Sequence, residues 1–239
     1  MSRYSLILSI VVVALVAAAC GDSSDTETFD FDGEPTAVVV ETVNGDVTVT
    51  RSSGSGSTVD ATVSYSGTRP TVAPLEIEAD GRLVIGDDCS QDCSVDYEIE
   101  VGDSADVTIE VGIGDITIND LDGSFTIKTG TGDVNIVSLV GDVTVEVGEG
   151  DILGARLTSA TSSFTAEKGA IDVTFDNVVD DLLIDSREGD VTAQLPGGPY
   201  QIDAASTKGR PDIKVDTDDA SSHAVKISSG DGDVTVYEK

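Results

Sequence analysis

Gly114-Asp115-Ile116-Thr117-Ile118 and Gly132-Asp133-Val134-Asn135-Ile136 are two copies of the phrase that decides the fold of this chain. Further copies, intact or degenerate, begin at Gly150, Gly169, Gly189, Gly209 and Gly232. Along this series the successive glycines lie 18, 18, 19, 20, 20 and 23 residues apart. A period near twenty with loose spacing is typical of stacked coils, in which insertions fall in loops.

Apolar and polar residues alternate on both sides of each Gly-Asp pair, which is the pattern of short, half-buried strands. The first inward residues expected in the Gly-Asp strands are Ile116, Val134, Ile152, Ile171, Val191, Ile213 and Val234. A second alternating run lies between neighbouring copies, so each coil should supply two or three strands that stack about 4.8 Å apart. The sequence therefore predicts an all-β solenoid with coils of 18–23 residues and very little helix. An antiparallel β-sandwich would also have many short strands, but it has no reason to repeat its turn.

Glycine suits a solenoid corner because it reaches positive φ at little steric cost. Gly114, Gly132, Gly150, Gly189 and Gly232 are therefore predicted to be structural turn residues. The aspartate that follows each glycine can accept hydrogen bonds from nearby turn amides.

Stacking would place Asp115, Asp133 and Asp151 one above another, which makes them candidate calcium ligands. The apolar residue follows the aspartate directly, unlike in calcium-binding β-rolls, and Ala170 and Arg210 interrupt the column. Turn chemistry is therefore favoured over a calcium array, and no cofactor is expected.

The first residues indicate export. An apolar run from Leu6 to Ala19 is shorter than a membrane span of about 20 residues and suits a signal peptide. Small residues before Cys20 and a polar tract after it resemble a bacterial lipobox, which implies cleavage before Cys20 and lipidation of that residue. The alternative is ordinary signal cleavage after Ala19. The expected organisation is a signal peptide over 1–19, a lipidated Cys20 with a flexible polar tether over 20–35, and a folded domain over 36–239.

The charge of the chain excludes some classes of partner. The chain has a formal net charge of −32, which becomes −33 when Arg3 is lost with the signal peptide. Such a chain repels nucleic acid and anionic lipid headgroups. The dispersed acidity favours a solvated surface adapted to salt, with divalent-cation binding as the alternative.

Two further cysteines, Cys89 and Cys93, are predicted to form a structural disulfide in an exported protein. A metal site or a redox pair is the alternative, but zinc normally needs four ligands and the chain's one histidine, His223, is distant in sequence. The catalytic motifs of serine hydrolases, zinc peptidases and phosphate-binding loops are absent from the sequence, so an enzyme is not expected.

The Gly-Asp coils, preceded by Cys89-x-x-x-Cys93 and the alternating run to Val101, resemble the bacterial domain of unknown function labelled "putative adhesin". The resemblance covers about residues 36–239. It implies a right-handed β-helix at the cell surface with an adhesive or envelope-associated role, and it brings no catalytic residues.

The expected protein is thus lipid-anchored to the outer face of the cell membrane and acts as a non-catalytic, adhesin-like interaction module. An envelope structural or stress-sensing component is the alternative, and a polysaccharide-acting enzyme is a more distant one. Val234 to Tyr237 runs almost to the end of the sequence, so this strand is expected to form an open edge for a surface protein or a second copy. The alternatives are that Glu238 and Lys239 guard the edge, or that an earlier loop covers it.

Overall fold

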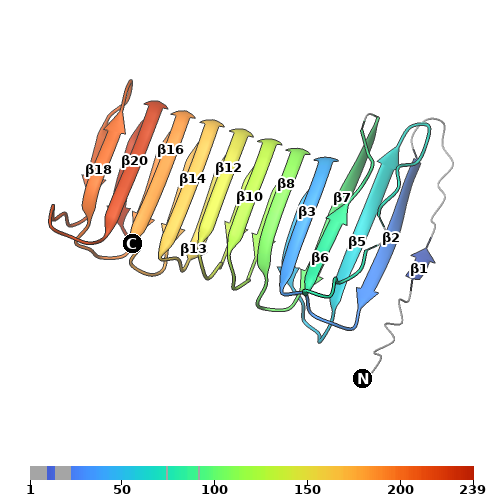
Figure 1. The fold of residues 1–239 in the computed structure, drawn as a ribbon. Helices are drawn as coiled ribbons and strands as arrows, with labels where there is room; N and C mark the ends of the chain where they lie inside the picture. Colours follow the sequence, from blue (N-terminus) through green and yellow to red (C-terminus); the bar gives the residue numbers. More distant parts are fainter. Residues whose placement is uncertain (1–9, 14–22, 74, 91) are drawn as a thin grey trace.

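The computed structural model describes residues 10–13, 23–73, 75–90 and 92–239. This part of the chain contains 21 β-strands and no helix. The strands form one sheet of twelve, here called sheet A, and one of nine, here called sheet B. Figure 1 shows the two sheets facing each other along an elongated stack. The all-β solenoid expected from the repeat is confirmed.

Each regular coil contributes one strand to each sheet, and the Gly-Asp corner joins them. The regular strands of sheet B are β3 (Ala37–Asn44), β8 (Asp106–Ile113), β10 (Phe125–Thr131), β12 (Val143–Glu149), β14 (Thr161–Lys168) and β16 (Asp181–Glu188). Those of sheet A are β4 (Val47–Arg51), β9 (Ile116–Asn119), β11 (Val134–Val137), β13 (Ile152–Leu157), β15 (Ile171–Phe175) and β17 (Val191–Leu195). Single-residue parallel bridges add a third side to part of the stack, as between Asp122 and Val140.

Parallel register places equivalent residues of successive coils beside one another, so one apolar column fills the interior. Val134 pairs with Ile116 on one side and Ile152 on the other, and all three are at most 1% exposed. Phe164 of sheet B meets Phe175 of sheet A edge to face, with ring centroids 6.4 Å apart. These contacts bury the repeated Val and Ile positions, which is why strands of only four or five residues are stable here.

The N-terminal end of the solenoid is closed by antiparallel strands. Strands β4 and β3 belong to the regular stack, but β7 (Cys93–Val101) is followed in sheet A by the antiparallel strands β5 (Ser57–Tyr65) and β2 (Ser23–Phe31). On sheet B the last strand is β6 (Arg82–Gly86), and isolated bridges join its region to Ile77 and Val72. Residues 37–51 therefore form the first coil, and most of residues 57–101 close its end.

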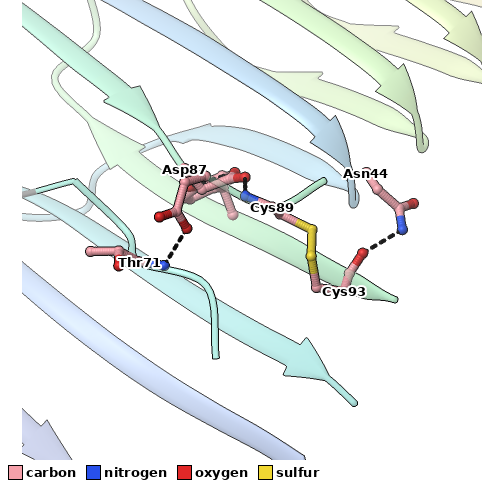
Figure 2. Close-up of a disulfide and its surroundings, with 7 residues drawn as sticks. Asn44, Thr71, Asp87, Cys89 and Cys93 are labelled. Atoms are coloured by element: carbon pink, nitrogen blue, oxygen red, sulfur yellow. Dashed lines mark hydrogen bonds between the residues drawn. A yellow bond between two sulfur atoms is a disulfide. The ribbon is translucent and has the colours of Figure 1, made fainter. Parts of the chain in front are cut away.

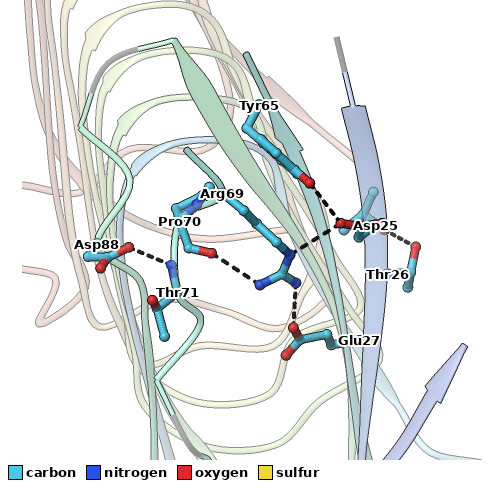
Figure 3. Close-up of polar contacts among 9 residues, drawn as sticks. Asp25, Thr26, Glu27, Tyr65, Arg69, Pro70, Thr71 and Asp88 are labelled. Atoms are coloured by element: carbon cyan, nitrogen blue, oxygen red, sulfur yellow. Dashed lines mark hydrogen bonds and ion pairs between the residues drawn. The ribbon is translucent and has the colours of Figure 1, made fainter. Parts of the chain in front are cut away.

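The flexible tether expected over 20–35 is wrong for most of its length, because Ser23–Phe31 is strand β2. Phe29 and Phe31 are 4% and 5% exposed. On the same strand Asp25 and Glu27 are half-buried and paired with Arg69 (Figure 3). The polar composition suggested a segment with little to bury, but Phe29 and Phe31 reach the core, and an arginine from the loop after β5 pairs with the two carboxylates that face it.

Strand β1 (Ile10–Val13) lies within the expected signal peptide and pairs antiparallel with β2. Cys20, the predicted lipidation site, lies outside the described residues. Among the described residues, no helix is long and apolar enough to cross a membrane.

The C-terminal end departs from sequential stacking. The last two strands, β20 (Ala224–Asp231) and β21 (Val234–Glu238), pair directly with β16 and β17. The preceding strands, β18 (Gln201–Ser206) and β19 (Pro211–Lys214), pack outside them. The expectation that Val234 to Tyr237 forms the open edge is therefore wrong, because an earlier coil covers this strand.

Candidate functional site

The corner glycines form a column in which a side chain has no room. Gly132 has φ +143°, and a Cβ built there would lie 2.0 Å from the carbonyl oxygen of Gly114. The same close approach, at 1.9 to 2.2 Å, recurs at Gly114, Gly150, Gly169, Gly189, Gly209 and Gly232. All these corners therefore need glycine because successive coils touch there, and those from Gly114 to Gly189 also need it for their positive φ, which Gly209 and Gly232 do not share.

The aspartates after these glycines form a ladder that runs between coils. The Asp133 amide donates to Oδ1 of Asp115, and the Asp151 amide donates to Oδ1 of Asp133, each over 2.8 Å. The ladder continues from Asp46 through Asp115 to Asp151 and the Ala170 amide, and again between Asp190, Asp233 and the Arg210 amide. The carboxylates accept hydrogen bonds from turn amides, as expected, but the amide belongs to the next coil.

This ladder explains a row of carboxylates without a metal ion. Within the described residues, no group of three or more His, Cys, Asp or Glu side chains is placed to hold a metal. One oxygen of each ladder carboxylate is directed to a backbone amide. Asp115, Asp133 and Asp151 are thus brought together as a structural column, and their use as calcium ligands remains a prediction.

A shallow groove of about 510 Å³ runs beside the ladder on the outer side of sheet A. Its walls include Asp115, Asp133, Asn135 and Leu153, and the Leu153 side chain is exposed. None of the ion pairs among the described residues involves the ladder aspartates of this groove. The groove is an open acidic surface with an apolar patch, and its described walls hold no histidine or cysteine.

Cys89 and Cys93 are joined by a disulfide, with their Cα atoms 5.8 Å apart (Figure 2). The Asn44 side chain donates to the Cys93 carbonyl over 2.7 Å, which ties the bridge to the first coil. Asp87 accepts a hydrogen bond from the Cys89 amide and another from the buried Tyr97 hydroxyl. Burial, and then the charge of Asp87, raise the pKa of Tyr97 above its ordinary value. The disulfide and these hydrogen bonds thus together stabilise the closed end.

The single histidine also has structural partners. His223 Nδ1 lies 2.9 Å from Asp180 Oδ1, and its ring packs edge to face against Tyr200. Asp180 precedes β16, so this contact fastens the loop before β20 to the strand that β20 joins. This arrangement positions a loop.

The C-terminal end is an open surface made by residues 201–223. The Gln201 amide donates to the His223 carbonyl just before β20, and the Thr207 amide donates to Ser229 of β20. The alternating residues Ile202, Ala204 and Ser206 therefore direct their N–H and C=O groups to the free side. On β19, Pro211 stands at the first position of the edge strand and has no N–H to offer. The two sheets thus end differently: sheet B offers a free edge, and sheet A ends in a guarded one.

This end coil carries a small net charge, because basic residues offset most of its aspartates. Residues 201–223 contain five aspartates and three basic residues, a net charge of −2 out of −32 for the whole chain. This surface is not among the sites that the sequence predicts. Its available signal was Pro211, because proline within a strand pattern indicates an edge strand.

These features define a parallel two-sheet β-solenoid with one closed and one open end. The chain belongs to the Toastrack family, DUF4097, whose model matches residues 31–237. Membership agrees with the resemblance to a bacterial domain of unknown function that the sequence indicated.

Solved structures of similar proteins carry adhesin names. A "putative adhesin" from Bacteroides fragilis NCTC 9343 is 18% identical over 90% of this chain and 97% of its own, with a TM-score of 0.50. A "putative cell adhesion protein" from Clostridium sporogenes ATCC 15579 is 12% identical over 98% of this chain and all of its own, with a TM-score of 0.38. No curated protein matches the chain. The first likeness shows the fold.

Proposed function

We propose that this protein is a non-catalytic, adhesin-like interaction module, held on the outer face of the cell membrane by a lipid on Cys20. The observation that carries the proposal is the open C-terminal end, which lies at the opposite end of the solenoid from β2 (Figure 1). One end closed by antiparallel strands suits attachment, and one end with a free sheet edge suits recognition.

The start of the fold sets the distance from the proposed anchor. Only Gly21 and Asp22 separate Cys20 from the first residue of β2 in the sequence, and the three steps from Cys20 to Ser23 span at most about 11 Å. A lipid on Cys20 would therefore hold the closed end beside the membrane. Sheet A has eleven strands from β2 to β19, so the open end would stand about 50 Å away along the stack.

The adhesin names of the solved neighbours and the membership in this family support a surface role. The high negative charge supports it in a second way, because acidic rods on one membrane repel each other and remain upright and separate.

The anchoring test is metabolic labelling with a fatty-acid analogue in a bacterial host that processes lipoproteins. The wild-type chain should carry label and remain with the membrane, whereas Cys20→Ser should be unlabelled and released. Ser24→Ala is the matched control and should behave as wild type. Antibody against residues 201–223 should bind intact cells. Unlabelled wild-type protein, or an epitope hidden on intact cells, would contradict the proposal.

A further inference from the structure

We infer that the open end pairs with the open end of a second copy, strand β18 against the partner's β18 in antiparallel orientation. This inference names the partner for the surface role proposed above and depends on that role only for its biological consequence. The pairing itself is a property of the folded chain.

The backbone of β18 leaves hydrogen-bonding groups without partners on its free side. The N–H groups of Ile202, Ala204 and Ser206 point away from β20, and no described residue accepts a backbone hydrogen bond from them. Unpaired edge groups of this kind are a template for another strand. At the closed end, Ile77 bridges Leu83 of β6 and Val72 bridges Asp87 directly after it, whereas on the free side of β18 the described bridge, between Tyr200 and Thr217, lies just before the strand.

The residues of β18 allow a symmetric register. If Ala204 faces the partner's Ala204, Ile202 faces the partner's Ser206, and all the outward-pointing groups of these residues find partners. On the outer face, Asp203 then lies opposite the partner's Ala205, so no charged residue directly opposes itself. A two-fold interface is by nature self-complementary, as this register is.

The apolar interior also ends at this surface. Ile202, Ala204, Ile213 and Val215 pack on the core but are only partly buried. Their counterparts in the internal coils are covered on both sides. A second copy placed across the two-fold axis would extend sheet B and bring the two unfinished core ends together, which removes apolar surface from water.

The end coil has a small net charge of −2, so two copies would repel each other only weakly there. Lys208, Arg210 and Lys214 lie in the same coil as Asp216, Asp218 and Asp219, so the end coil carries both signs of charge. A second copy is therefore the occupant we assign to this edge.

Antiparallel pairing of the two tips has a geometric consequence for anchored protein. The two β2 strands would lie at opposite ends of the dimer, about 100 Å apart by strand spacing. Two copies lipidated at Cys20 could meet in this way only from facing membranes. The dimer would thus be a homotypic bridge between cells.

The first experiment measures mass by sedimentation equilibrium on residues 21–239, which contain the whole apolar core from Phe29 to Val236. The mass should rise from one chain to two with concentration. Ala204→Pro removes one outward N–H without removing a bond to β20, so it should remain folded and stay monomeric. Ala204→Val retains the N–H and is the control. A wild-type monomer at every concentration, or an undiminished dimer in Ala204→Pro, would overturn the inference.

A second experiment tests the register and does not depend on proline. Paired Ala204 residues would have Cα atoms about 5.5 Å apart, within disulfide range, so Ala204→Cys should yield a covalent dimer on oxidation. In the same register the two Ala205 residues are diagonal neighbours about 8 Å apart, so Ala205→Cys should not cross-link. Cross-linking of both variants alike would refute the register.

Vesicles separate this inference from the proposed function. Wild-type protein tethered through its N-terminus to neutral phosphatidylcholine vesicles should cluster them, and Ala204→Pro should abolish clustering. Clustering that persists with Ala204→Pro, or that requires a different protein on the facing vesicle, would overturn self-pairing. A lipidated, surface-exposed chain that fails to dimerise would leave the anchored module standing and remove only its proposed partner.

Discussion

At the scale of single residues, the corner requires glycine for two separate reasons, its positive φ and its lack of a side chain. Gly132 combines a positive φ with direct contact on the coil below, whereas Gly67 has φ +103° with no heavy atom within 4 Å of an added Cβ. The aspartate next to Gly132 is likewise both an acceptor and a charge. Each of these pairs of properties can be separated by substitution.

Gly132→Ala should destabilise the protein by more than about 3 kcal/mol, because the new Cβ meets the Gly114 carbonyl oxygen at 2.0 Å in addition to the backbone strain. Gly67→Ala should cost only about 1 kcal/mol, since it has the backbone strain without the contact. Urea unfolding followed by circular dichroism measures both. Equal losses would mean that backbone conformation, and not the stacking of coils, requires glycine at the corner.

Asp133→Ala should lower the free energy of unfolding by about 1 kcal/mol, because the Asp151 amide loses its acceptor. Asp133→Asn should cost less or even stabilise, since the amide oxygen still accepts and a charge leaves the column. Unfolding in chelator and in calcium compares the two variants. If Asn proves as damaging as Ala, and only when calcium is present, the ladder is a cation site after all.

Tyr97 should make the fold sensitive to alkali. Burial and Asp87 raise its pKa in the folded state above the ordinary 10.0, so the stability it contributes is present below pH 10 and is lost as the pH rises above it. Above that pH, the free energy of unfolding should fall more steeply in wild type than in Tyr97→Phe, by up to about 1.4 kcal/mol per pH unit. Parallel curves for the two proteins would show that Tyr97 titrates normally.

At the scale of strands and coils, the sequence was sufficient for the period, the inward residues and the corners, because these repeat locally. The sequence was not sufficient to predict the order of the coils, since every coil has the same Gly-Asp corner and the same alternation. Strand β20 therefore fits beside β16 as well as β18 would. Non-local choices of this kind leave few marks in one sequence. Pro211 is such a signal, because proline suits only an edge strand. Arg69, whose ion pairs with Asp25 and Glu27 hold β2 in place, is a weaker signal.

The exchanged coil order can be tested with paired cysteines on the outer face of sheet A. Thr192 of β17 is directly paired with Thr235 of β21, whereas Asp212 of β19 lies one strand further out. Thr192→Cys with Thr235→Cys should form a disulfide on mild oxidation. Thr192→Cys with Asp212→Cys should not, since two strand spacings are about 9.6 Å. Peptide mapping without reductant reads the result, and the reverse pattern would restore sequential stacking.

At the scale of the whole molecule, a net charge of −32 on a rod must oppose its own compact state. The ladder aspartates recur at the spacing of the coils, about 4.8 Å, which is shorter than the screening length of about 8 Å at physiological ionic strength. The acidic residues elsewhere are spread over both sheets. The repulsion is therefore spread over the whole molecule, and added salt should screen all of these charges.

We expect the melting temperature of residues 21–239 to rise with potassium chloride and to rise equally with calcium chloride at matched ionic strength. Screening depends on ionic strength, whereas a specific site would add the binding energy of one ion. The control is Asp133→Asn, which should respond to both salts as wild type does. An extra increase with calcium that this variant abolishes would make the ladder a calcium site. Bridging of acidic surfaces by calcium would then compete with strand pairing as the means by which two anchored copies meet.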